Sequence, residues 1–218
     1  MLKDAILERG KALNQDVLLV DSFLNHQVDV ALMEEIGEEF AKYFADRGIT
    51  RVVTIESSGI APASFTALAL GLPLVIMKKQ TSRILKGDLL QTTVRSFTKG
   101  TQYELTVKRE FLPAGEKILL IDDFLASGEA AFGVIHLAQQ AGAEIAGIGI
   151  VIEKAFQSGH QRLADEGMDV YSLARIASLS ADAIPFAEST IFAVGDSLPR
   201  FIFTKNLELD ARFFCEIC

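Results

Sequence analysis

Two adjacent carboxylates, Asp122 and Asp123, follow a run of apolar residues in the stretch KILLIDDFLASGEAAFG, residues 117–133. Ionised carboxylates accept hydrogen bonds from hydroxyl groups or bind cations, and they repel a bare phosphate. Ser127 and Gly128 follow soon after, where a helix is expected to begin. The unpaired N–H groups of a helix start favour an anion such as phosphate. The stretch therefore predicts a site for a ligand that carries hydroxyls beside a phosphate, as ribose 5-phosphate does.

The small residues of this stretch support the same prediction. Ala126, Gly128 and Ala130 would let the backbone approach a ligand closely, and Ser127 could add a hydroxyl donor. The chain has neither a GxxxxGK[ST] phosphate loop nor a GxGxxG dinucleotide motif. An alternative stays open, in which the two acids are only a solvated strand exit beside a helix cap.

The elements that must position these groups alternate along the chain. Apolar segments predict strands at residues 51–56, 72–77, 117–123 and 144–153. Helical periodicity predicts helices at residues 30–47, 61–70 and 128–141, each followed by a glycine. Strands that are apolar throughout indicate a parallel sheet covered on both faces. The predicted fold class is therefore α/β, with a doubly wound parallel sheet.

Polar or charged groups stand at the carboxyl end of every predicted strand. Open α/β sheets bind ligands at this edge, so the four ends are expected to open onto one crevice. At a single strand end the simpler interpretation is a solvated surface, but four together favour a site. The groups are Glu56-Ser57-Ser58-Gly59, Lys78-Lys79, Asp122-Asp123 and Glu153-Lys154.

A polar, Thr-rich segment at residues 78–108 separates the two strand-helix-strand units. Residues 91–107 alternate in polarity and predict a hairpin that turns near TKGT. An insertion of this length is typical of a lid or binding loop. Four basic residues could bring positive charge to the crevice: Lys78, Lys79, Arg95 and Lys99.

Composition excludes several classes of protein. The chain has 218 residues, 50% of them hydrophobic, which suits one globular domain. A net charge of −8 argues against a general nucleic-acid surface, and we expect no membrane partner because no apolar run is long enough to span a bilayer. With no signal peptide expected, the protein is predicted to be cytoplasmic. Cys215 and Cys218 cannot complete a four-ligand zinc site, so CEIC is interpreted as an apolar chain end. His26, His136 and His160 are scattered and indicate no nucleophilic triad.

The stretch ILLIDDFLASGEA closely resembles the signature of type I phosphoribosyltransferases that binds 5-phosphoribosyl 1-pyrophosphate (PRPP). Further segments resemble the purine branch of this family in the same order: LLVDSFLNHQVD, TIESSGIAP, SFTK, AGIGIVIEKAFQ and SLARI. The resemblance covers residues 1–188 and implies a single phosphoribosyltransferase domain there, with a small hood from terminal segments and an inserted flexible hairpin loop. Residues 189–218 have no counterpart and are expected to be a C-terminal extension of unknown role.

The resemblance also implies roles for individual residues. Asp122 and Asp123 match the catalytic acids that face the ribose hydroxyls. The PRPP-binding loop matches Ala126, Ser127, Gly128, Glu129 and Ala130. The pyrophosphate loop, in which a strained non-proline peptide bond is usual, matches Ser57, Ser58 and Gly59. Xanthine-contacting positions match Leu18, Asn25 and Lys154. Without the resemblance, Lys154 would be a solvated ion-pair partner of Glu153.

The implied reaction transfers the phosphoribosyl group of PRPP to a purine and releases pyrophosphate. Mg²⁺ bound with PRPP and a homodimer are implied as well, and the metal ligands stay unassigned. Ala126 stands where hypoxanthine-guanine enzymes carry an aspartate base, which argues against that substrate class without choosing between the others. The resemblance implies xanthine, which is more acidic than hypoxanthine and needs less help to lose its proton. Adenine enzymes also have alanine there, so another purine such as adenine or guanine stays an alternative.

A second hypothesis is a PRPP-sensing purine regulator without catalysis. Regulators of this kind carry an N-terminal DNA-binding domain, and the twenty residues before Asp21 are too few for one. An enzyme is therefore the preferred interpretation, and a regulator that acts through a protein partner stays an alternative.

Overall fold

A five-stranded parallel sheet forms the centre of the computed structural model, which describes residues 1–79, 87–96, 100–180 and 183–187. The strand order is β4-β3-β7-β8-β9, and all four pairings are parallel. The strands are β3 (Arg51–Ile55), β4 (Leu74–Met77), β7 (Lys117–Leu125), β8 (Glu144–Lys154) and β9 (Val170–Ile176). The predicted α/β fold with a parallel sheet is confirmed.

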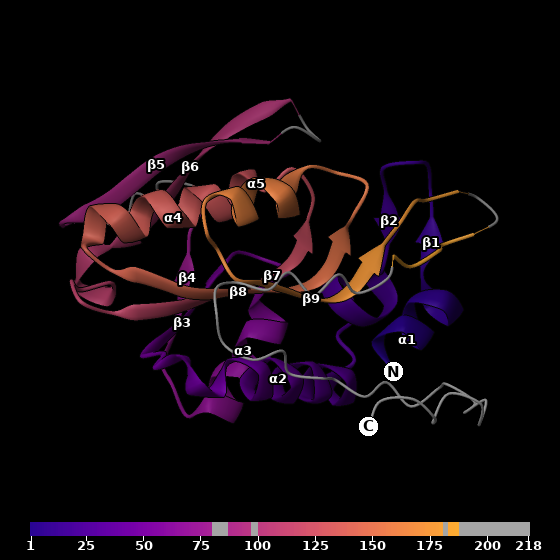
Figure 1. Cartoon of the computed structure of the whole chain (residues 1–218), viewed down its shortest axis with the longest axis horizontal. Helices are drawn as coiled ribbons and strands as arrows, with labels where there is room; N and C mark the ends of the chain where they lie inside the picture. Colours follow the sequence, from indigo (N-terminus) through magenta and orange to yellow (C-terminus); the bar gives the residue numbers. More distant parts are fainter. Residues whose placement is uncertain (80–86, 97–99, 181–182, 188–218) are drawn as a thin grey trace, which may run out of the picture.

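Helices cover both faces of this sheet (Figure 1). On one face lie α2 (Val30–Phe44) and α3 (Ile60–Leu70), and on the other lie α4 (Glu129–Ala141) and α5 (Gly159–Asp165). Because side chains alternate along a strand, Leu119 and Ile121 of β7 belong to the core beside α2 and α3, whereas Leu120 belongs to the core beside α4. The sheet is therefore doubly wound.

Helix α2 begins where the side chain of Asp29 accepts a hydrogen bond from the Leu32 N–H (3.2 Å). The predicted end at residue 47 is wrong for the α-helix, which stops at Phe44. The chain continues as a 3-10 turn, Ala45–Arg47, and Gly48 ends it with a φ of 64°. The tighter turn explains why helical periodicity in the sequence extends beyond the α-helix.

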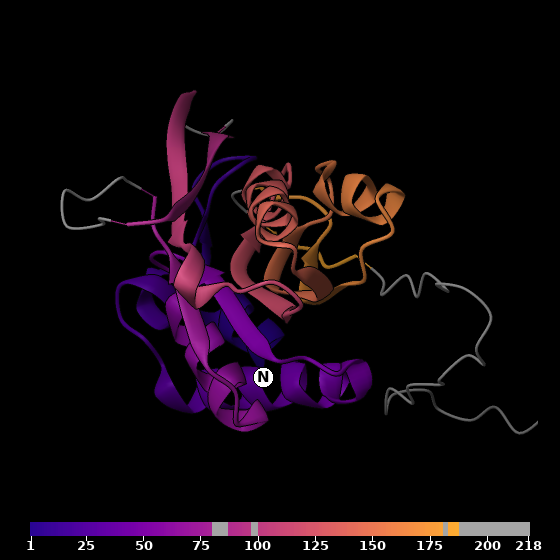
Figure 2. The ribbon, with the colours of Figure 1, turned by 90° about the vertical axis from the view of Figure 1, so that its left-hand side faces the viewer.

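The predicted hairpin is confirmed as β5 (Leu89–Ser96) and β6 (Thr101–Lys108), paired antiparallel from Leu89↔Lys108 to Ser96↔Thr101. A bridge between Lys78 and Thr106 joins it to the end of β4. Its apolar side chains pack near Gly133 of α4, and Figure 2 shows the hairpin standing beside that helix. Lys99 lies outside the described residues.

The N-terminal segment forms elements that the sequence did not predict. They are α1 (Leu2–Arg9), the short antiparallel pair β1 (Lys11–Ala12) and β2 (Leu18–Leu19), and the π-helical turn η1 (Asp21–Asn25). Helix α1 lies against β9, and Phe186 forms an antiparallel bridge with Ile176, the last residue of that strand. Segments from both ends of the described chain thus meet beside β9, which agrees with a hood built from terminal segments. The predicted extension 189–218, with Cys215 and Cys218, lies outside the described residues.

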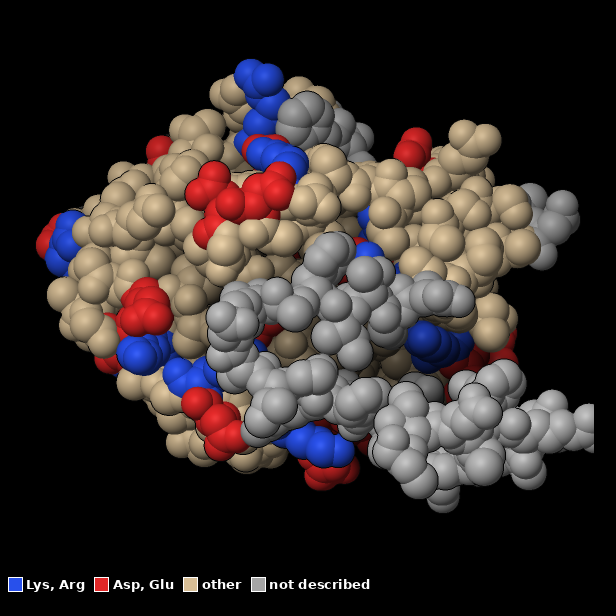
Figure 3. Space-filling model, viewed as in Figure 1, with Lys and Arg blue, Asp and Glu red and all other residues tan. Residues whose placement is uncertain are grey.

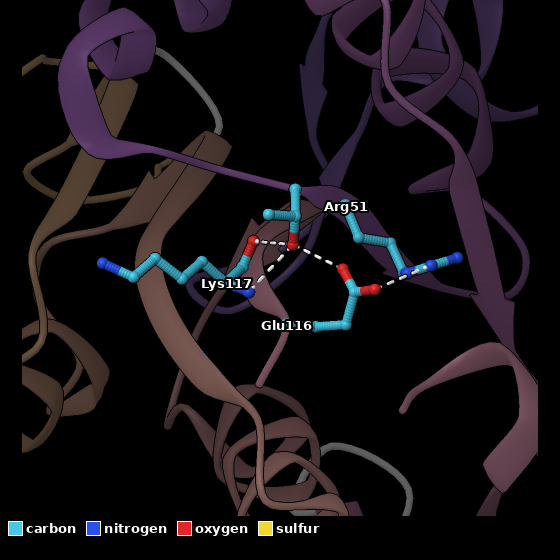
Figure 4. A network of polar contacts seen from close by, with 4 residues as sticks. Arg51, Glu116 and Lys117 are labelled. Atoms are coloured by element: carbon cyan, nitrogen blue, oxygen red, sulfur yellow. Dashed lines mark hydrogen bonds and ion pairs between the residues drawn. The ribbon is translucent and has the colours of Figure 1, made fainter. Parts of the chain in front are cut away.

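A polar network joins β3 and β7 at their amino ends (Figure 4). Arg51 Nη2 lies 3.0 Å from Glu116 Oε1, and the Thr50 hydroxyl donates to the other oxygen of Glu116. The Thr50 hydroxyl also accepts the Lys117 N–H at 2.9 Å. These contacts lower the pKa of Glu116, chiefly through the hydrogen bond from Arg51. The network holds the two strands in register at the edge opposite to the predicted crevice.

Charges of both signs are interspersed among the described residues on the face shown in Figure 3. Within the described part of the chain, no helix has the length and apolar character needed to cross a membrane.

Gly37 of α2 lies against Phe65 of α3, and its replacement tests the packing of the two helices. A Cβ at this position would lie 2.5 Å from the backbone carbon of Phe65. Alanine gains about 1 kcal/mol in helix propensity, but overpacking against backbone typically costs about 1–3 kcal/mol. We expect Gly37→Ala to lower the free energy of unfolding, measured by urea titration. Glu38→Ala, an exposed neighbour, should change it by less than about 0.5 kcal/mol. Equal stability of the two variants would contradict this packing.

Candidate functional site

A cleft of about 540 Å³ opens at the carboxyl edge of the sheet. It brings together residues from the ends of β3, β4, β7 and β8, and it also takes in residues of the hairpin and of the β1–β2 segment. Each of the four predicted strand ends therefore contributes to one crevice, but Gly59, Lys78 and Glu153 are not among its lining residues. The lining includes Val17, Leu18, Glu56, Ser57, Ser58, Lys79, Arg95, Tyr103, Asp122, Asp123, Phe124, Ala126, Ser127, Gly128, Glu129, Ala130 and Lys154.

The two acids lie inside β7, so the prediction that the strand ends with them is wrong. The ladder with β8 continues through Asp122↔Ile150 to Leu125↔Glu153. Both carboxylates nevertheless line the cleft. Burial, and then the charge of Asp123, raises the pKa of Asp122 well above its ordinary value, against a smaller opposing effect of Lys79. Asp122 therefore holds its proton more tightly than a solvated aspartate does.

The residues after β7 form a tight turn that leads into α4. Gly128 has a φ of 88°, in the left-handed region that glycine adopts without strain, and it stands at the N-terminal cap of the helix. Every residue from Ala126 to Ala130 lines the cleft. The loop therefore presents small residues and the start of a helix of 13 residues to the cleft, an arrangement that binds anions.

The turn after β3 contributes to the same cleft. The Glu56–Ser57 peptide bond is cis, and Ser57 and Ser58 line the cleft. Gly59 is buried behind them, where a Cβ would lie 2.4 Å from Thr54 Oγ1 and 3.0 Å from Asp122 Oδ1. Only glycine lets this turn pack so closely against the acid of β7.

Glu56 is held by the chain that follows β4. Its carboxylate accepts the Lys79 N–H (2.8 Å) and lies 3.1 Å from Lys78 Nζ. Burial opposes ionisation, but the hydrogen bonds from Lys79 and Lys78 outweigh it and lower the pKa of Glu56. The two strand ends are thus fixed to each other, and the Lys79 side chain lines the cleft.

Lys154 and Leu18 both reach the cleft, whereas Asn25 does not line it. Lys154 is 9% exposed; its ammonium donates to the Asp16 carbonyl and lies 5.6 Å from the centroid of the Phe124 ring. Burial lowers its pKa, and the charges of Asp16 and Asp123 partly offset that effect. Asn25 is exposed at the end of η1 and is absent from the cleft lining.

Glu153 lies away from the cleft, so its predicted place at the crevice is wrong. It is 1% exposed, with one carboxylate oxygen 2.9 Å from His160 Nδ1 and the other 3.0 Å from Arg175 Nε. Successive strand residues point to opposite faces, which separates Glu153 from Lys154. The interpretation of Lys154 as a solvated partner of Glu153 is therefore wrong as well.

Sequence reasoning missed Tyr103 as a residue of the cleft. It is half-buried on β6, and Lys79 Nζ lies 5.7 Å from its ring centroid. Burial, with further effects of the charges of Asp122 and Glu129, raises the pKa of Tyr103 to about 12. Its alternation with polar neighbours predicted a strand, but only the docking of the hairpin shows which face meets the cleft.

Comparisons with known proteins agree on one family. The model of the phosphoribosyl transferase domain matches residues 20–174. The chain is 58% identical to xanthine phosphoribosyltransferase 1 of Clostridium botulinum, over 86% of this chain and 98% of that protein. It is 59% identical to the xanthine phosphoribosyltransferase of Clostridium acetobutylicum, over 83% and 96% of the two chains.

Similar solved structures share the fold. The adenine phosphoribosyltransferase of Thermoanaerobacter pseudethanolicus superposes with a TM-score of 0.68 at 19% identity, over 80% of this chain and 99% of that one. The enzyme of Giardia lamblia, complexed with 9-deazaadenine, gives a TM-score of 0.69 at 23% identity, over 80% and 97%. At this level of identity the likeness concerns the fold alone.

The raised pKa of Asp122 predicts a pH-dependent stability that Asp122→Asn removes. Between the pKa of this group in the unfolded chain and its higher pKa in the fold, the folded state binds more protons. The stability of the wild type therefore falls as pH rises through that range. We expect the free energy of unfolding of the variant to exceed that of the wild type by a margin that widens as pH rises from acid to neutral. Urea titrations in chelator-containing buffer measure it.

Asp165→Asn is the control for this experiment, because Asp165 is exposed on α5. The free energy of unfolding of this variant should change with pH as that of the wild type does. A constant margin for Asp122→Asn would show that Asp122 titrates like a solvated carboxyl.

Proposed function

The chain belongs to the phosphoribosyl transferase family, and from that premise we propose that it transfers the 5-phosphoribosyl group of PRPP to xanthine. The products are xanthosine 5′-monophosphate and pyrophosphate, as purine salvage requires. The observation that carries this proposal is that one cleft joins the acids of β7, the small-residue loop before α4 and Lys154. Relatives named as xanthine phosphoribosyltransferases, 58% and 59% identical, support the choice of base.

PRPP lies along the carboxyl ends of β7 and β3. Asp122 and Asp123 accept hydrogen bonds from the ribose hydroxyls. The loop Ala126–Ala130 binds the 5-phosphate through its amide groups, and the α4 dipole adds to the attraction. Ser57 and Ser58 receive the pyrophosphate across the cleft, while Gly59 lets their turn pack against β7.

Xanthine lies beside Leu18 and Lys154. The Lys154 ammonium exchanges its bond to the Asp16 carbonyl for one to a ring oxygen or to the anionic base. The apolar side chains of Leu18 and Phe124 flank the ring. Asn25 is assigned to the purine edge from the family resemblance, because its amide offers both a donor and an acceptor.

Catalysis rests on positioning and on charge. Positive charge develops on the ribose as pyrophosphate leaves, so the fixed amides at residues 57–59 and the Lys79 ammonium stabilise the departing anion. The hairpin excludes water, since its Arg95 and Tyr103 line the cleft. Ala126 supplies no base to the purine, and the acidity of xanthine makes this group unnecessary.

Mg²⁺ is the proposed cofactor, bound together with PRPP. Mg²⁺ prefers one or two carboxylates plus substrate phosphates to a cage built from protein alone. Asp122 and Asp123 fit this preference, and the described residues contain no group of three or more His, Cys, Asp or Glu that could hold a metal. When bound, Mg²⁺ neutralises the charge of the diphosphate. We further propose a homodimer located in the cytoplasm.

Turnover with separate bases tests the function. With PRPP and Mg²⁺, we expect pyrophosphate release to be fastest with xanthine among xanthine, guanine, hypoxanthine and adenine. Lys154→Met removes a hydrogen bond from a charged group, worth about 1.5–3 kcal/mol, so kcat/KM for xanthine should fall on the order of 10- to 100-fold. Lys42→Met, an exposed position on α2, should leave it unchanged.

The outcomes of this assay separate the hypotheses. PRPP binding without turnover of any base would favour the regulator. Faster turnover of adenine or guanine than of xanthine would overturn the choice of xanthine, but it would still support phosphoribosyl transfer to a purine.

Removal of divalent metal tests the cofactor. We expect a chelator to abolish turnover and added Mg²⁺ to restore it. Asp123→Asn should raise the Mg²⁺ concentration for half-maximal rate, because one proposed ligand loses its charge. Full activity in excess chelator would contradict the proposal.

A further inference from the structure

An acidic residue stands inside the proposed phosphate loop. Glu129 is the first residue of α4 and lines the cleft. A carboxylate stabilises a helix N-terminus, but it also repels a phosphate bound there. The loop therefore needs a cation that balances Glu129 without occupying the phosphate site.

Arg162 of α5 provides this cation from behind the loop. Its Nη1 lies 2.6 Å from Glu129 Oε1 and also donates to the Ser127 carbonyl. Its guanidinium lies 4.7 Å from the ring centroid of Phe132, in the first turn of α4. Arg162 itself does not line the cleft. It can act on a bound phosphate only through the loop.

Helix α5 is held firmly enough to support the loop. Its Leu163 is fully buried, and His160 binds the buried Glu153 carboxylate at the end of β8. The Gly159 N–H donates to the Ala126 carbonyl at 3.0 Å. A Cβ on Gly159 would lie 2.3 Å from that carbonyl oxygen. Figures 1 and 2 both show α5 beside α4 on the same face of the sheet.

We propose that Arg162 is a positioning residue for PRPP, which holds the loop 126–130 in shape through Ser127 and cancels the charge of Glu129 so that the loop accepts the 5-phosphate. The inference rests on the proposed function. It adds a residue outside the loop that sets the affinity for one end of the substrate and leaves the pyrophosphate end untouched.

The chain offers a matched control for an ordinary surface ion pair. Arg47 and Asp169 lie 2.6 Å apart, the same distance as Arg162 and Glu129. The side chains are 44% and 19% exposed in the control pair, and 41% and 24% exposed in the proposed one. Exposed pairs contribute about 0–1 kcal/mol to stability. Arg47→Ala therefore measures the loss of such a pair at a site away from the cleft.

The test measures binding of ribose 5-phosphate and of pyrophosphate separately by calorimetry. Arg162→Ala should weaken ribose 5-phosphate on the order of 10-fold and raise the KM for PRPP to a similar extent, as expected for the loss of a charge-assisted contact. Affinity for pyrophosphate and kcat should change less than about 2-fold, since the turn at residues 57–59 does not touch Arg162. Arg47→Ala should leave all of these values as in the wild type.

Two further variants make the inference falsifiable. In the Arg162→Ala background, Glu129→Gln removes the unbalanced charge and should recover a large part of the lost affinity for ribose 5-phosphate. Arg162→Lys keeps the charge but not the guanidinium, whose Nη1 contacts both Ser127 and Glu129, so its affinity should be intermediate. It also serves as the main variant if Arg162→Ala does not fold.

The inference is overturned if Arg162→Ala behaves like Arg47→Ala, or if affinity for pyrophosphate falls as much as that for ribose 5-phosphate. If Glu129→Gln recovers no affinity for ribose 5-phosphate in the Arg162→Ala background, the proposed charge balance between Arg162 and Glu129 is overturned. A wild-type protein that binds neither ligand would instead overturn the proposed function, which separates the two failures.

Discussion

The parallel ladder between β7 and β8 is the constraint on which the cleft depends. It continues past both acids to Leu125↔Glu153, so Asp122 and Asp123 are held on an extended backbone. The loop toward α4 starts only where this ladder ends. Strand pairing thereby fixes the distance from the two acids to the start of α4. A ligand that carries hydroxyls beside a phosphate must fit this fixed distance.

The cleft keeps charges of opposite sign close together without pairing them fully. Burial raises the pKa of Asp122 and lowers that of Lys154, so each group is shifted toward its neutral form. Shifts of this kind are common where a ligand supplies the missing partner. Glu56 differs, because the Lys78 ammonium pairs with its carboxylate and the Lys79 N–H donates to it. The carboxylates of β7 and the ammonium of Lys154 are therefore the charged groups that we propose for substrate binding.

How much the sequence predicts depends on how local each signal is. Apolar runs and helical periodicity located the sheet and α2, and the pair Asp122-Asp123 with Ser127-Gly128 located the cleft. The end of β7 could not be predicted, because pairing with β8 decides it. Whether Tyr103 lines the cleft depends on how the hairpin of β5 and β6 docks. Arg162 carries no local signal, since only the fold brings α5 behind the loop.

The end of β8 links the two halves of the cleft. Glu153 and Lys154 are adjacent, and alternation sends Lys154 to the cleft and Glu153 to His160 and Arg175. The end of β8 thus places Lys154, the residue proposed to bind the purine, and also anchors α5, the helix that supports the phosphate loop. A shift of β8 by one residue would exchange the two side chains, which would put a carboxylate beside Phe124 and free α5 from its anchor. The register of β8 therefore controls both ends of the proposed substrate site.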